Sequence, residues 1–454
     1  MGHPSPRGAA KHSTHGRATM TSMEDDRRAH SVWRNADFVR LWMAGTISVF
    51  GSLVTRTALP FAAILALGAG PIEIAILRTL QLVPGLLLGL FAGAWVDRLR
   101  RRPIMIVADV GRAVLLGSIP VAAVFGILGL AQLYLVTFLA AGLTTFFDVA
   151  DRAYLPTVVD QDQIVPANSA LTASASVAEF SAFGISGFLI QLFSAPLAIA
   201  VDAVSFLVSA LFLGSIRRPE PPRPPVAARE PVLREIREGL RLIGGSRILR
   251  ALAGAGAASH VMWGVFGTSY LLFASRDLGL GPAAIGVIAG LGGAGSFVGA
   301  VLAGGSERRL GVGRTILLGM LGFTIGSAFI PLAPSGALVL GAACLIVQQL
   351  VGDSAGTLFE ITQVSLTQSV VEDRLLGRVN GSIRFFEDVF QLAGTIVGGV
   401  IAEVIGLRGA MAFGVLGGVV ALGFLWFSPI PRLRTMPKRP VTTIPGTSEL
   451  PLTE

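Results

Sequence analysis

Cysteine and lysine are almost missing from this chain of 454 residues, which has one cysteine, Cys344, and two lysines, Lys11 and Lys438. A single cysteine within an apolar run excludes a disulfide framework and a cysteine-based metal site. A phosphate-binding loop needs a lysine after its glycines, and neither lysine has that motif, so ATP-driven pumping is excluded. The sequence shows no metal-ligand cluster and no nucleophile beside a base. We therefore expect no enzyme, no cofactor and no metal centre.

Charged residues are scarce as well. They make up 14% of the chain against 52% hydrophobic residues, and the mean hydropathy is +0.69. A water-facing surface needs more polar residues, so the composition indicates a polytopic membrane protein surrounded by a lipid bilayer. The net charge of +8 does not indicate nucleic acid, because the arginines lie between apolar runs and not on one aromatic-rich patch.

The chain consists mainly of long apolar runs separated by short basic turns. The stretch from Gly93 to Arg102 carries Asp97 and four arginines between two such runs. About 20 apolar residues span the roughly 30 Å core of a bilayer, so each run predicts a transmembrane helix. Twelve helices are predicted, at 38–67, 72–94, 104–128, 132–148, 168–193, 197–216, 249–274, 283–304, 314–331, 337–360, 380–405 and 409–428.

The basic residues predict the orientation of these helices. Only Arg276 and Arg408 fall in outer loops and three arginines fall within helices, which leaves 31 of the 36 basic residues on the inner side. Positive charge is retained in the cytoplasm. The sequence therefore predicts a multi-pass protein of the cell membrane with both termini cytoplasmic.

Five regions follow from this map. They are a disordered cytoplasmic tail at 1–37, a six-helix bundle at 38–216, a linker at 217–248, a second six-helix bundle at 249–428 and a cytoplasmic tail at 429–454. The linker opens with five prolines and becomes amphipathic from Val232 to Ile243. Two interpretations of that stretch are open: a helix lying on the inner leaflet, or a solvated linker helix.

The two bundles repeat each other. Asp97-Arg98 in the first is echoed by Glu307-Arg308 in the second, and Asn168 is echoed by Asn380 at nearly the same separation along the chain. Two parallel copies related about an axis along the membrane normal are typical of transporters with a substrate site between the halves. The predicted fold class is an all-α integral membrane protein with twelve transmembrane helices arranged as two parallel six-helix repeats.

The sequence resembles the major facilitator superfamily over roughly residues 38–428. The turn from Gly93 to Arg102 resembles its signature loop: a Gly, three intervening residues, Asp-Arg and a basic cluster. Three further stretches resemble the bacterial drug and siderophore exporter branch, "FVRLWMAGTISVFGS", "DRAYLPTVVDQDQIVPANSAL" and "DRLLGRVNGSIRFFEDVFQLAGTIVGGVIAE". Drug antiporters of the superfamily typically carry Gly-Pro in the segment 168–193, whereas this chain has Gly184-Ile185-Ser186-Gly187.

The resemblance implies that the signature loop latches the inner side shut in the outward-open state. Asp97 would contact the positive N-terminal end of a neighbouring helix, which contributes about 0.3 to 2 kcal/mol, and would pair with arginines across the halves. The predicted latch consists of Gly93, Asp97, Arg98, Arg101, Arg102, Glu307, Arg308 and Arg378. The alternative interpretation is that the arginines only determine topology.

Glycines recur every fourth or fifth residue in several segments and predict close helix packing, as small residues permit in membranes. The predicted packing positions are Gly85, Gly89, Gly184, Gly187, Gly295 and Gly299.

Ionisable residues at membrane depth indicate the substrate and proton pathway, because such charges are costly and usually functional. Glu179 lies about halfway along its segment and is the predicted proton carrier, with Arg56 and Arg78 as alternating partners or as an anion site. A static Glu–Arg pair between helices is the alternative. Asp109 and Arg112 are expected as a pair at the inner face and Asp202 near the outer face.

Three further residues are predicted to contribute to the pathway. Asp353 is expected to line the cavity. His260 and Trp263 fall on one face of their segment and together suit an aromatic or cationic substrate. A structural hydrogen bond is the alternative role for His260.

The leading functional hypothesis is a monomeric secondary active exporter of amphipathic small molecules, driven by proton antiport. A second hypothesis is an importer or facilitator of an endogenous solute. A third, from another class, is a transport-inactive membrane sensor or scaffold, which the short and featureless tails disfavour.

Overall fold

The structure is a computed structural model that describes residue 2 and residues 32–96, 99–220 and 232–437. Several sequence predictions fall outside these ranges. They concern the N-terminal tail up to residue 31, Asp97 and Arg98 of the predicted latch, most of the proline-rich part of the linker and the C-terminal tail from residue 438.

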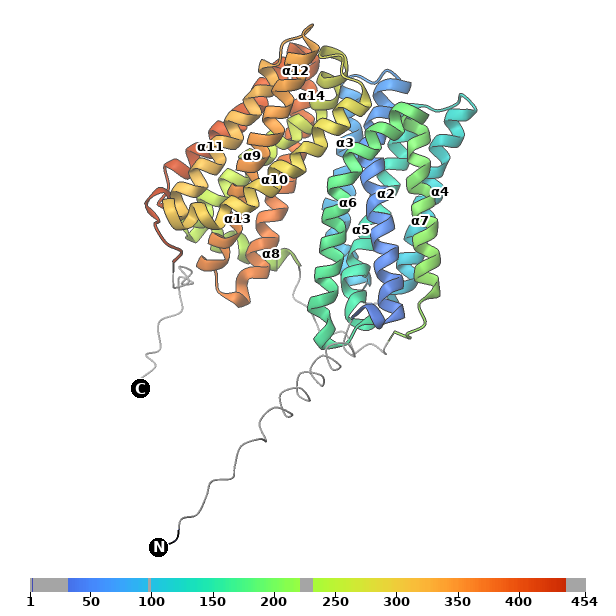
Figure 1. Cartoon of the computed structure of the whole chain (residues 1–454), viewed down its shortest axis with the longest axis horizontal. Coiled ribbons are helices and arrows are strands. Elements are labelled where there is room, and N and C mark those ends of the chain that lie inside the picture. The colour runs from blue at the N-terminus through green and yellow to red at the C-terminus, as the bar shows by residue number, and fades with distance from the viewer. Residues whose placement is uncertain (1, 3–31, 97–98, 221–231, 438–454) are drawn as a thin grey trace.

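The chain folds into two bundles of long helices that stand side by side (Figure 1). The first bundle contains α2 (Ala36–Phe61), α3 (Pro71–Val96), α4 (Arg101–Val124), α5 (Leu130–Val158), α6 (Ile164–Phe193) and α7 (Ala195–Ser215). The second contains α9 (Arg247–Leu272), α10 (Pro282–Leu310), α11 (Val312–Leu332), α12 (Leu338–Val347), α13 (Asp353–Val370) and α14 (Asp373–Trp426). Short 3₁₀ turns lie at η1 (Val32–Arg34), η3 (Gln161–Gln163) and η6 (Ile430–Arg432).

Twelve membrane crossings can be counted in the described chain. Ten helical segments are long and apolar enough to cross a membrane. One of them, α14, contains two crossings, because Gly406 breaks its helical geometry with a φ of 83°. The twelfth crossing is α9, 26 residues long, with its π-helical extension η4 (Phe273–Asp277). The predicted fold class of twelve helices in two six-helix repeats is confirmed.

Irregularities in the helices show that the bundles are copies of one unit. The π-turn η2 (Ala62–Ala66), at the end of the first crossing, recurs in the second bundle as η4 at the end of α9. Gly68 and Gly279 follow these π-turns with φ values of 67° and 69°. Ser194 and Gly406 both have a φ of 83° and occupy equivalent turns of the two repeats. Since positive φ is strained for residues other than glycine, Ser194 keeps the shared turn geometry at a cost that Gly406 avoids.

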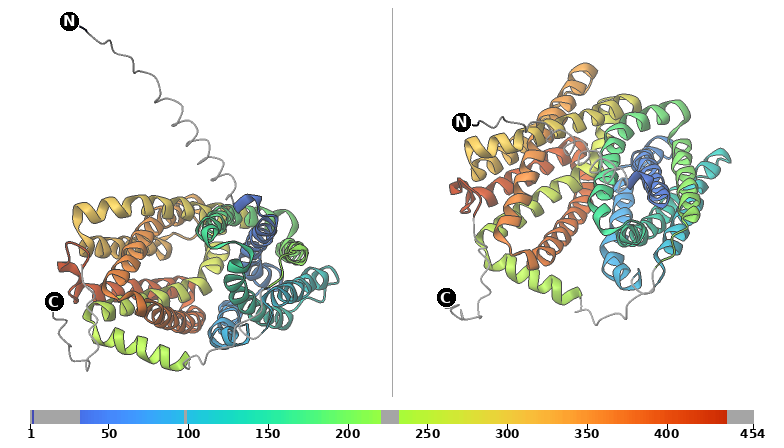
Figure 2. Two further views of the ribbon diagram at one scale, coloured as in Figure 1. Left: turned by 90° about the horizontal axis from the view of Figure 1, so that it is seen from below. Right: turned by 60° about the horizontal axis from the view of Figure 1, so that its bottom comes forward.

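The bundles contact each other mainly on one side of the molecule. Residues 32 and 437, the first and last residues of the described helical body, lie on what we call the terminal side, and the far side is opposite (Figures 1 and 2). On the far side Arg276 donates from Nη2 to the carbonyl oxygen of Ala69 at 2.8 Å. The backbone N–H of Ala283 donates to Gln191 Oε1 at 3.2 Å. These two bonds connect the bundles across the far side.

The amphipathic stretch of the linker forms the helix α8 (Val232–Gly245) and packs on the second bundle. In Figure 2 it runs along the edge of that bundle. A Cβ atom at Gly239 would lie 2.6 Å from the carbonyl oxygen of Arg378, so the missing side chain allows α8 to approach α14 closely. Ile243 is buried on the same helix. The helix is therefore fixed to the start of α14 through this face.

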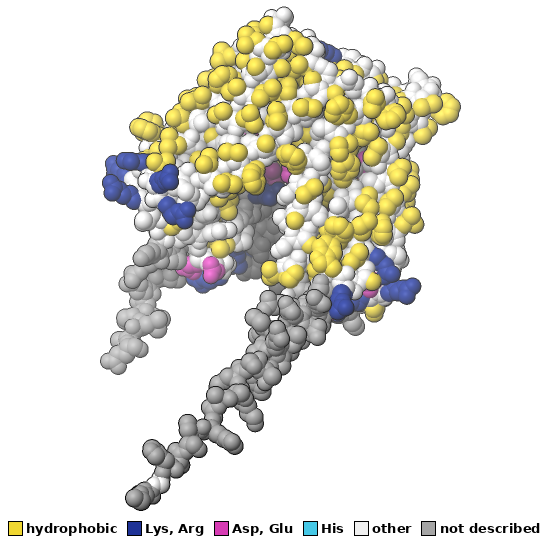
Figure 3. Space-filling view, in the orientation of Figure 1, with side chains coloured by type: hydrophobic (Ala, Val, Ile, Leu, Met, Phe, Trp, Pro, Cys, Tyr) yellow, Lys and Arg dark blue, Asp and Glu magenta, His cyan; other side chains and the backbone are white. Residues whose placement is uncertain are grey.

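The surface shows how the molecule sits in a bilayer. Hydrophobic side chains cover most of the body, and Lys and Arg side chains gather near the terminal side (Figure 3). A hollow between the bundles opens on that side, and acidic and basic side chains are visible inside it.

Candidate functional site

A cavity of about 1230 Å³ lies between the two bundles. Its wall contains residues of α2, α3 and α6 from the first bundle and of α9, α10, α11, the π-turn η5 (Gln348–Gly352), α13 and α14 from the second. Aromatic rings form much of this wall, including Phe180, Phe183, Trp263, Phe266, Tyr270 and Phe323. A cavity of this size and composition is suited to a small molecule with a large apolar surface.

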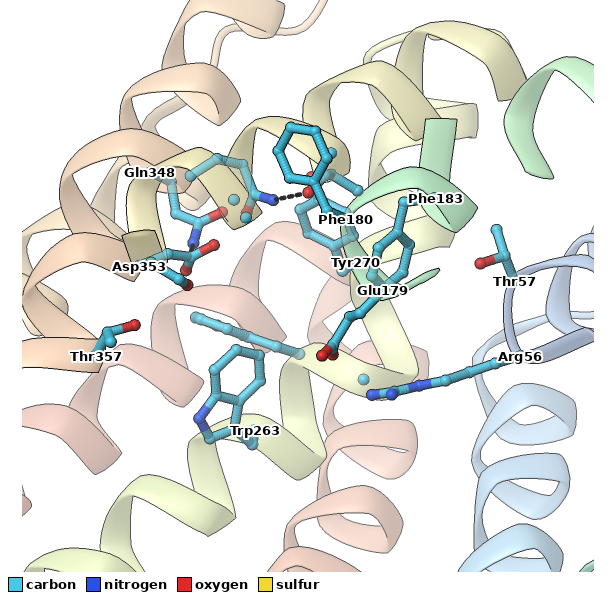
Figure 4. A pocket seen from close by; sticks show the side chains of 18 of the residues that line it. Arg56, Thr57, Glu179, Phe180, Phe183, Trp263, Tyr270, Gln348, Asp353 and Thr357 are labelled. Atoms are coloured by element: carbon cyan, nitrogen blue, oxygen red, sulfur yellow. Dashed lines mark hydrogen bonds between the residues drawn. The ribbon is translucent and has the colours of Figure 1, made fainter. Parts of the chain in front are cut away.

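Glu179, Arg56 and Arg78 all line this cavity. Glu179 lies at the middle of α6, and its carboxylate points toward the guanidinium of Arg56 on α2 (Figure 4). Arg78 on α3 donates from Nη1 to Gln81 Oε1 at 3.3 Å, while its buried Nε has no hydrogen-bond partner among the described residues. The first bundle thus presents one carboxylate and two guanidinium groups to the cavity.

The second bundle presents Asp353, at the end of the π-turn η5. Its Oδ1 accepts a hydrogen bond from Gln348 Nε2 at 3.0 Å, visible in Figure 4. A Cβ at Gly292 on α10 would lie 2.5 Å from Asp353 Oδ2 and 2.7 Å from Gln349 Nε2, so only glycine leaves room for these side chains. Tyr270 also lines the cavity, and within the described chain its hydroxyl has no hydrogen-bond partner. π-Turns of this kind occur frequently at functional sites.

Trp263 and His260, predicted as a pair, are separated by the structure. Trp263 lines the cavity and packs against Phe323 with ring centroids 5.8 Å apart. His260 is not among the cavity-lining residues of the described chain; its Nδ1 lies 2.9 Å from the carbonyl oxygen of Gly256. Its ring lies near Glu387 of α14 instead. The helical turn between residues 260 and 263 directs the two side chains to different neighbours.

The described residues of the predicted latch make contacts within their own halves. Arg101 Nη1 donates to the carbonyl oxygen of Ala153 at 2.7 Å, and Arg102 Nε donates to that of Leu213 at 2.8 Å. Arg378 Nη1 donates to Glu238 Oε2 of α8 at 2.5 Å. Glu307 and Arg308 lie at the terminal-side end of α10, and Gly93 lies in α3. In this conformation, in which the terminal side is open, Arg378 is therefore paired with the linker helix.

The glycines predicted at packing positions fall into two groups. A Cβ at Gly187 would lie 2.5 Å from the carbonyl oxygen of Pro282, and Gly295 and Gly299 face the backbone of Gln349 and Ser354 just as closely. At Gly85, Gly89 and Gly184, no atom of the described residues lies within 4 Å of a Cβ position. Close packing against described residues therefore does not occur at these three positions.

Sequence reasoning missed most of the cavity wall. Phe180, Phe183 and Tyr270 carry no charge or motif that distinguishes them from core residues, although all three line the cavity. The sequence signal for two of them is their closeness to Glu179. Phe180 follows Glu179 directly, and Phe183 lies about one helical turn after it.

Two six-helix bundles with a cavity between them are typical of membrane transporters built from two repeats. The sequence matches the Major Facilitator Superfamily over residues 41–395 and again over 252–451, and the chain belongs to that superfamily. It is a membrane transporter of this type.

Similar proteins and structures agree with this assignment. The chain is 26% identical to the uncharacterized MFS-type transporter YfiS of Bacillus subtilis (strain 168) over 386 residues, covering 82% of this chain and 88% of that one. It is 34% identical to the uncharacterized MFS-type transporter Rv0037c of Mycobacterium tuberculosis (strain ATCC 25618 / H37Rv) over 155 residues, 33% and 35% of the two chains. The fold is similar to that of the nucleoside transporter NupG, with a TM-score of 0.67, 12% identity and coverage of 86% and 98%. It is also similar to a bacterial homologue of the iron transporter ferroportin in the inward-facing state, with a TM-score of 0.69, 17% identity and coverage of 87% and 99%. These identities are too low for the structures to indicate a substrate.

Proposed function

We propose that this transporter exports amphipathic small molecules in exchange for protons, and that Glu179 carries the proton. The observation that carries the proposal is the position of Glu179: a carboxylate at the middle of a transmembrane helix, in an aromatic cavity that both bundles line. An ionisable group at this depth is costly to maintain and is typical of proton relays in transporters.

The orientation needed for export follows from the arginine distribution. Because basic residues gather on the terminal side, that side is assigned to the cytoplasm. The cavity then opens to the cytoplasm in the present conformation, and the contacts of Arg276 and Gln191 close the outer side. A substrate from the cytoplasm or the inner leaflet enters from this side.

The cavity favours molecules with both an apolar body and a charged or polar group. Its rings offer stacking surfaces, and aromatic faces attract cations. Glu179 and Asp353 lie on opposite bundles, so each bundle presents a carboxyl group to the cavity beside the guanidinium groups of Arg56 and Arg78. We take an aromatic cation as the substrate class, because the aromatic wall adds to the attraction of the two carboxyl groups.

The position of Glu179 opposite Arg56 provides the coupling in this proposal. Glu179 binds a proton when the cavity opens outward and releases it to the cytoplasm when the cavity opens inward. Export of one substrate cation is thereby linked to entry of at least one proton.

The test uses everted vesicles with an imposed pH gradient, acid inside, and a fluorescent aromatic cation as substrate. In the parent, adding the dye is expected to dissipate the gradient. Glu179→Gln is expected to lower that dissipation at least about tenfold, since removal of a proton-transfer group typically costs that much or more. Binding of the dye to the purified variant should remain.

The matched control is Glu403→Gln, an equivalent change at an exposed glutamate of α14 outside the cavity wall, which should behave like the parent. Dissipation by Glu179→Gln at the parental rate would refute the proton role of Glu179. If the parent itself dissipates no gradient but accumulates solute in right-side-out vesicles, the importer hypothesis replaces export.

A further inference from the structure

A group of ionisable side chains lies buried inside the first bundle, outside the cavity wall. Asp109 and Arg112 on α4 and Asp202 on α7 expose only 0%, 3% and 1% of their surfaces. Arg112 Nη2 donates to Asp109 Oδ1 at 2.5 Å. Its guanidinium lies 4.4 Å from the ring centre of Phe147 and 4.0 Å from that of Phe206. The pair expected at the inner face therefore lies at mid-depth, and Asp202, expected near the outer face, belongs to the same group.

The charges in this group do not balance. The three innermost groups comprise two carboxylates and one guanidinium. From α5, Asp148, Asp151 and Arg152 act on the same site, while α2 contributes the hydroxyl of Thr55. Asp148 and Arg152 are exposed and Asp151 is half-buried, so the balance is set by the three buried groups, two carboxylates against one guanidinium. An uncompensated carboxylate in the interior of a bundle is strongly unfavourable, so the imbalance requires a bound positive charge.

Hydroxyl groups surround the two carboxylates without neutralising them. Asp202 Oδ1 accepts a hydrogen bond from Ser205 Oγ at 3.0 Å. Thr55 also lies beside Asp202, and Ser209 lies beside Asp109. These neutral donors satisfy carboxylate oxygens but leave the negative charge in place. A proton shared by the two carboxyl groups removes one negative charge.

The second bundle shows that the fold does not need these charges. When the repeats are aligned on their π-turns and on the turns at Ser194 and Gly406, Asp109, Arg112 and Asp202 correspond to Met320, Phe323 and Gly414. Met320 and Phe323 are buried at 0% and 5% exposure, and Gly414 contacts Phe266, the counterpart of Thr55. One bundle thus packs apolar side chains where the other keeps four polar ones. Retaining buried charges where an apolar core suffices indicates a role other than stability.

We propose that Asp202 and Asp109 together hold one proton inside the first bundle, at a site distinct from the Glu179 site in the cavity. The two sites are separated by a single helix: Thr55 of α2 lies beside Asp202, while the next residue, Arg56, lines the cavity. Gly51 makes this approach possible, because a Cβ there would lie 2.5 Å from Asp202 Oδ1. The site belongs to the folded bundle, so its protonation does not depend on whether the transporter exports drugs.

The proposal is tested by infrared spectroscopy of the full-length protein in lipid nanodiscs at pH 7. Glu179→Gln/Asp353→Asn removes the two cavity acids and serves as the background, which is expected to show the carbonyl band of a protonated carboxylic acid. Adding Asp202→Asn should abolish that band, because Asp109 alone is balanced by Arg112. Asparagine keeps the shape of the side chain, and thermal unfolding of the variant verifies that it is folded.

Three results would overturn the proposal. The first is absence of the band in the background variant. The second is survival of the band after Asp202→Asn. The third is its loss at constant pH when sodium chloride replaces choline chloride, which would identify a metal-cation site instead. Since none of these measurements uses transport, a failure of the export proposal leaves this test intact.

Discussion

Replacing Gly187 by leucine is expected to shift the protein toward a conformation that is open on the far side. A Cβ at this position would lie 2.5 Å from the carbonyl oxygen of Pro282 and 3.1 Å from the Cα of Gly286, both in the other bundle. Overpacking of this kind costs about 1 to 3 kcal/mol. Because about 1.4 kcal/mol changes an equilibrium tenfold, the closed far side becomes about five- to 150-fold less favoured.

Spin labels at Ile127 and Val339, which are exposed at the far-side ends of the two bundles, measure this shift as a longer distance. The single native cysteine, Cys344, is first replaced by serine. The matched control is Gly184→Leu in the same helix, where no described atom lies within 4 Å of the added Cβ and the distance should stay parental. An unchanged distance in Gly187→Leu would show that the far side does not close through this contact.

Replacing Arg112 by leucine is expected to destabilise the protein by about 3 to 5 kcal/mol, the typical cost of leaving a buried carboxylate without its partner. Asp109 has no exposed surface and loses the guanidinium that lies 2.5 Å from its Oδ1. The bundle also loses the packing of Arg112 between two phenylalanine rings. The measurement is unfolding of the purified protein in mixed micelles, followed by helix content.

Two comparison variants separate charge from packing in this prediction. Arg309→Leu changes an exposed arginine at the end of α10 and should stay within about 0.5 kcal/mol of the parent. Asp109→Met/Arg112→Phe installs the residues found at the corresponding positions 320 and 323 of the second bundle, and should recover most of the lost stability. A double variant no more stable than Arg112→Leu would contradict the charge argument.

The fold could be predicted from the sequence because hydrophobic run length is a strong physical constraint in membranes. Spans of about 20 apolar residues and motifs that recur at a nearly constant separation indicate both bundles from the sequence alone. The break at Gly406 could also be predicted from the sequence, because it falls in the gap between the predicted helices at 380–405 and 409–428. The π-turns could not be predicted, because a π-turn widens the helix by one residue without changing the hydropathy of the segment.

The cavity was predicted at Trp263 and where charged residues mark it. Glu179, Arg56, Arg78 and Asp353 stand out in apolar segments, and all of them line the cavity. Glycine spacing was a weaker guide to close packing. Similar spacing occurs at Gly187, which packs against the other bundle, and at Gly85, where no described atom lies within 4 Å of a Cβ position. Which face of a helix meets the other bundle depends on its rotation, and hydropathy does not fix that rotation in a helix that is apolar all round.

The central claim is that the two bundles open the cavity alternately to the two sides. Two spin-label pairs measured in the same conditions test it most directly: Val165 with Leu310 on the terminal side and Ile127 with Val339 on the far side. As the pH is lowered from 8 to 5 in nanodiscs, the account predicts that the terminal-side distance shortens while the far-side distance lengthens. Distances that change in the same direction, or a change on one side only, would contradict it.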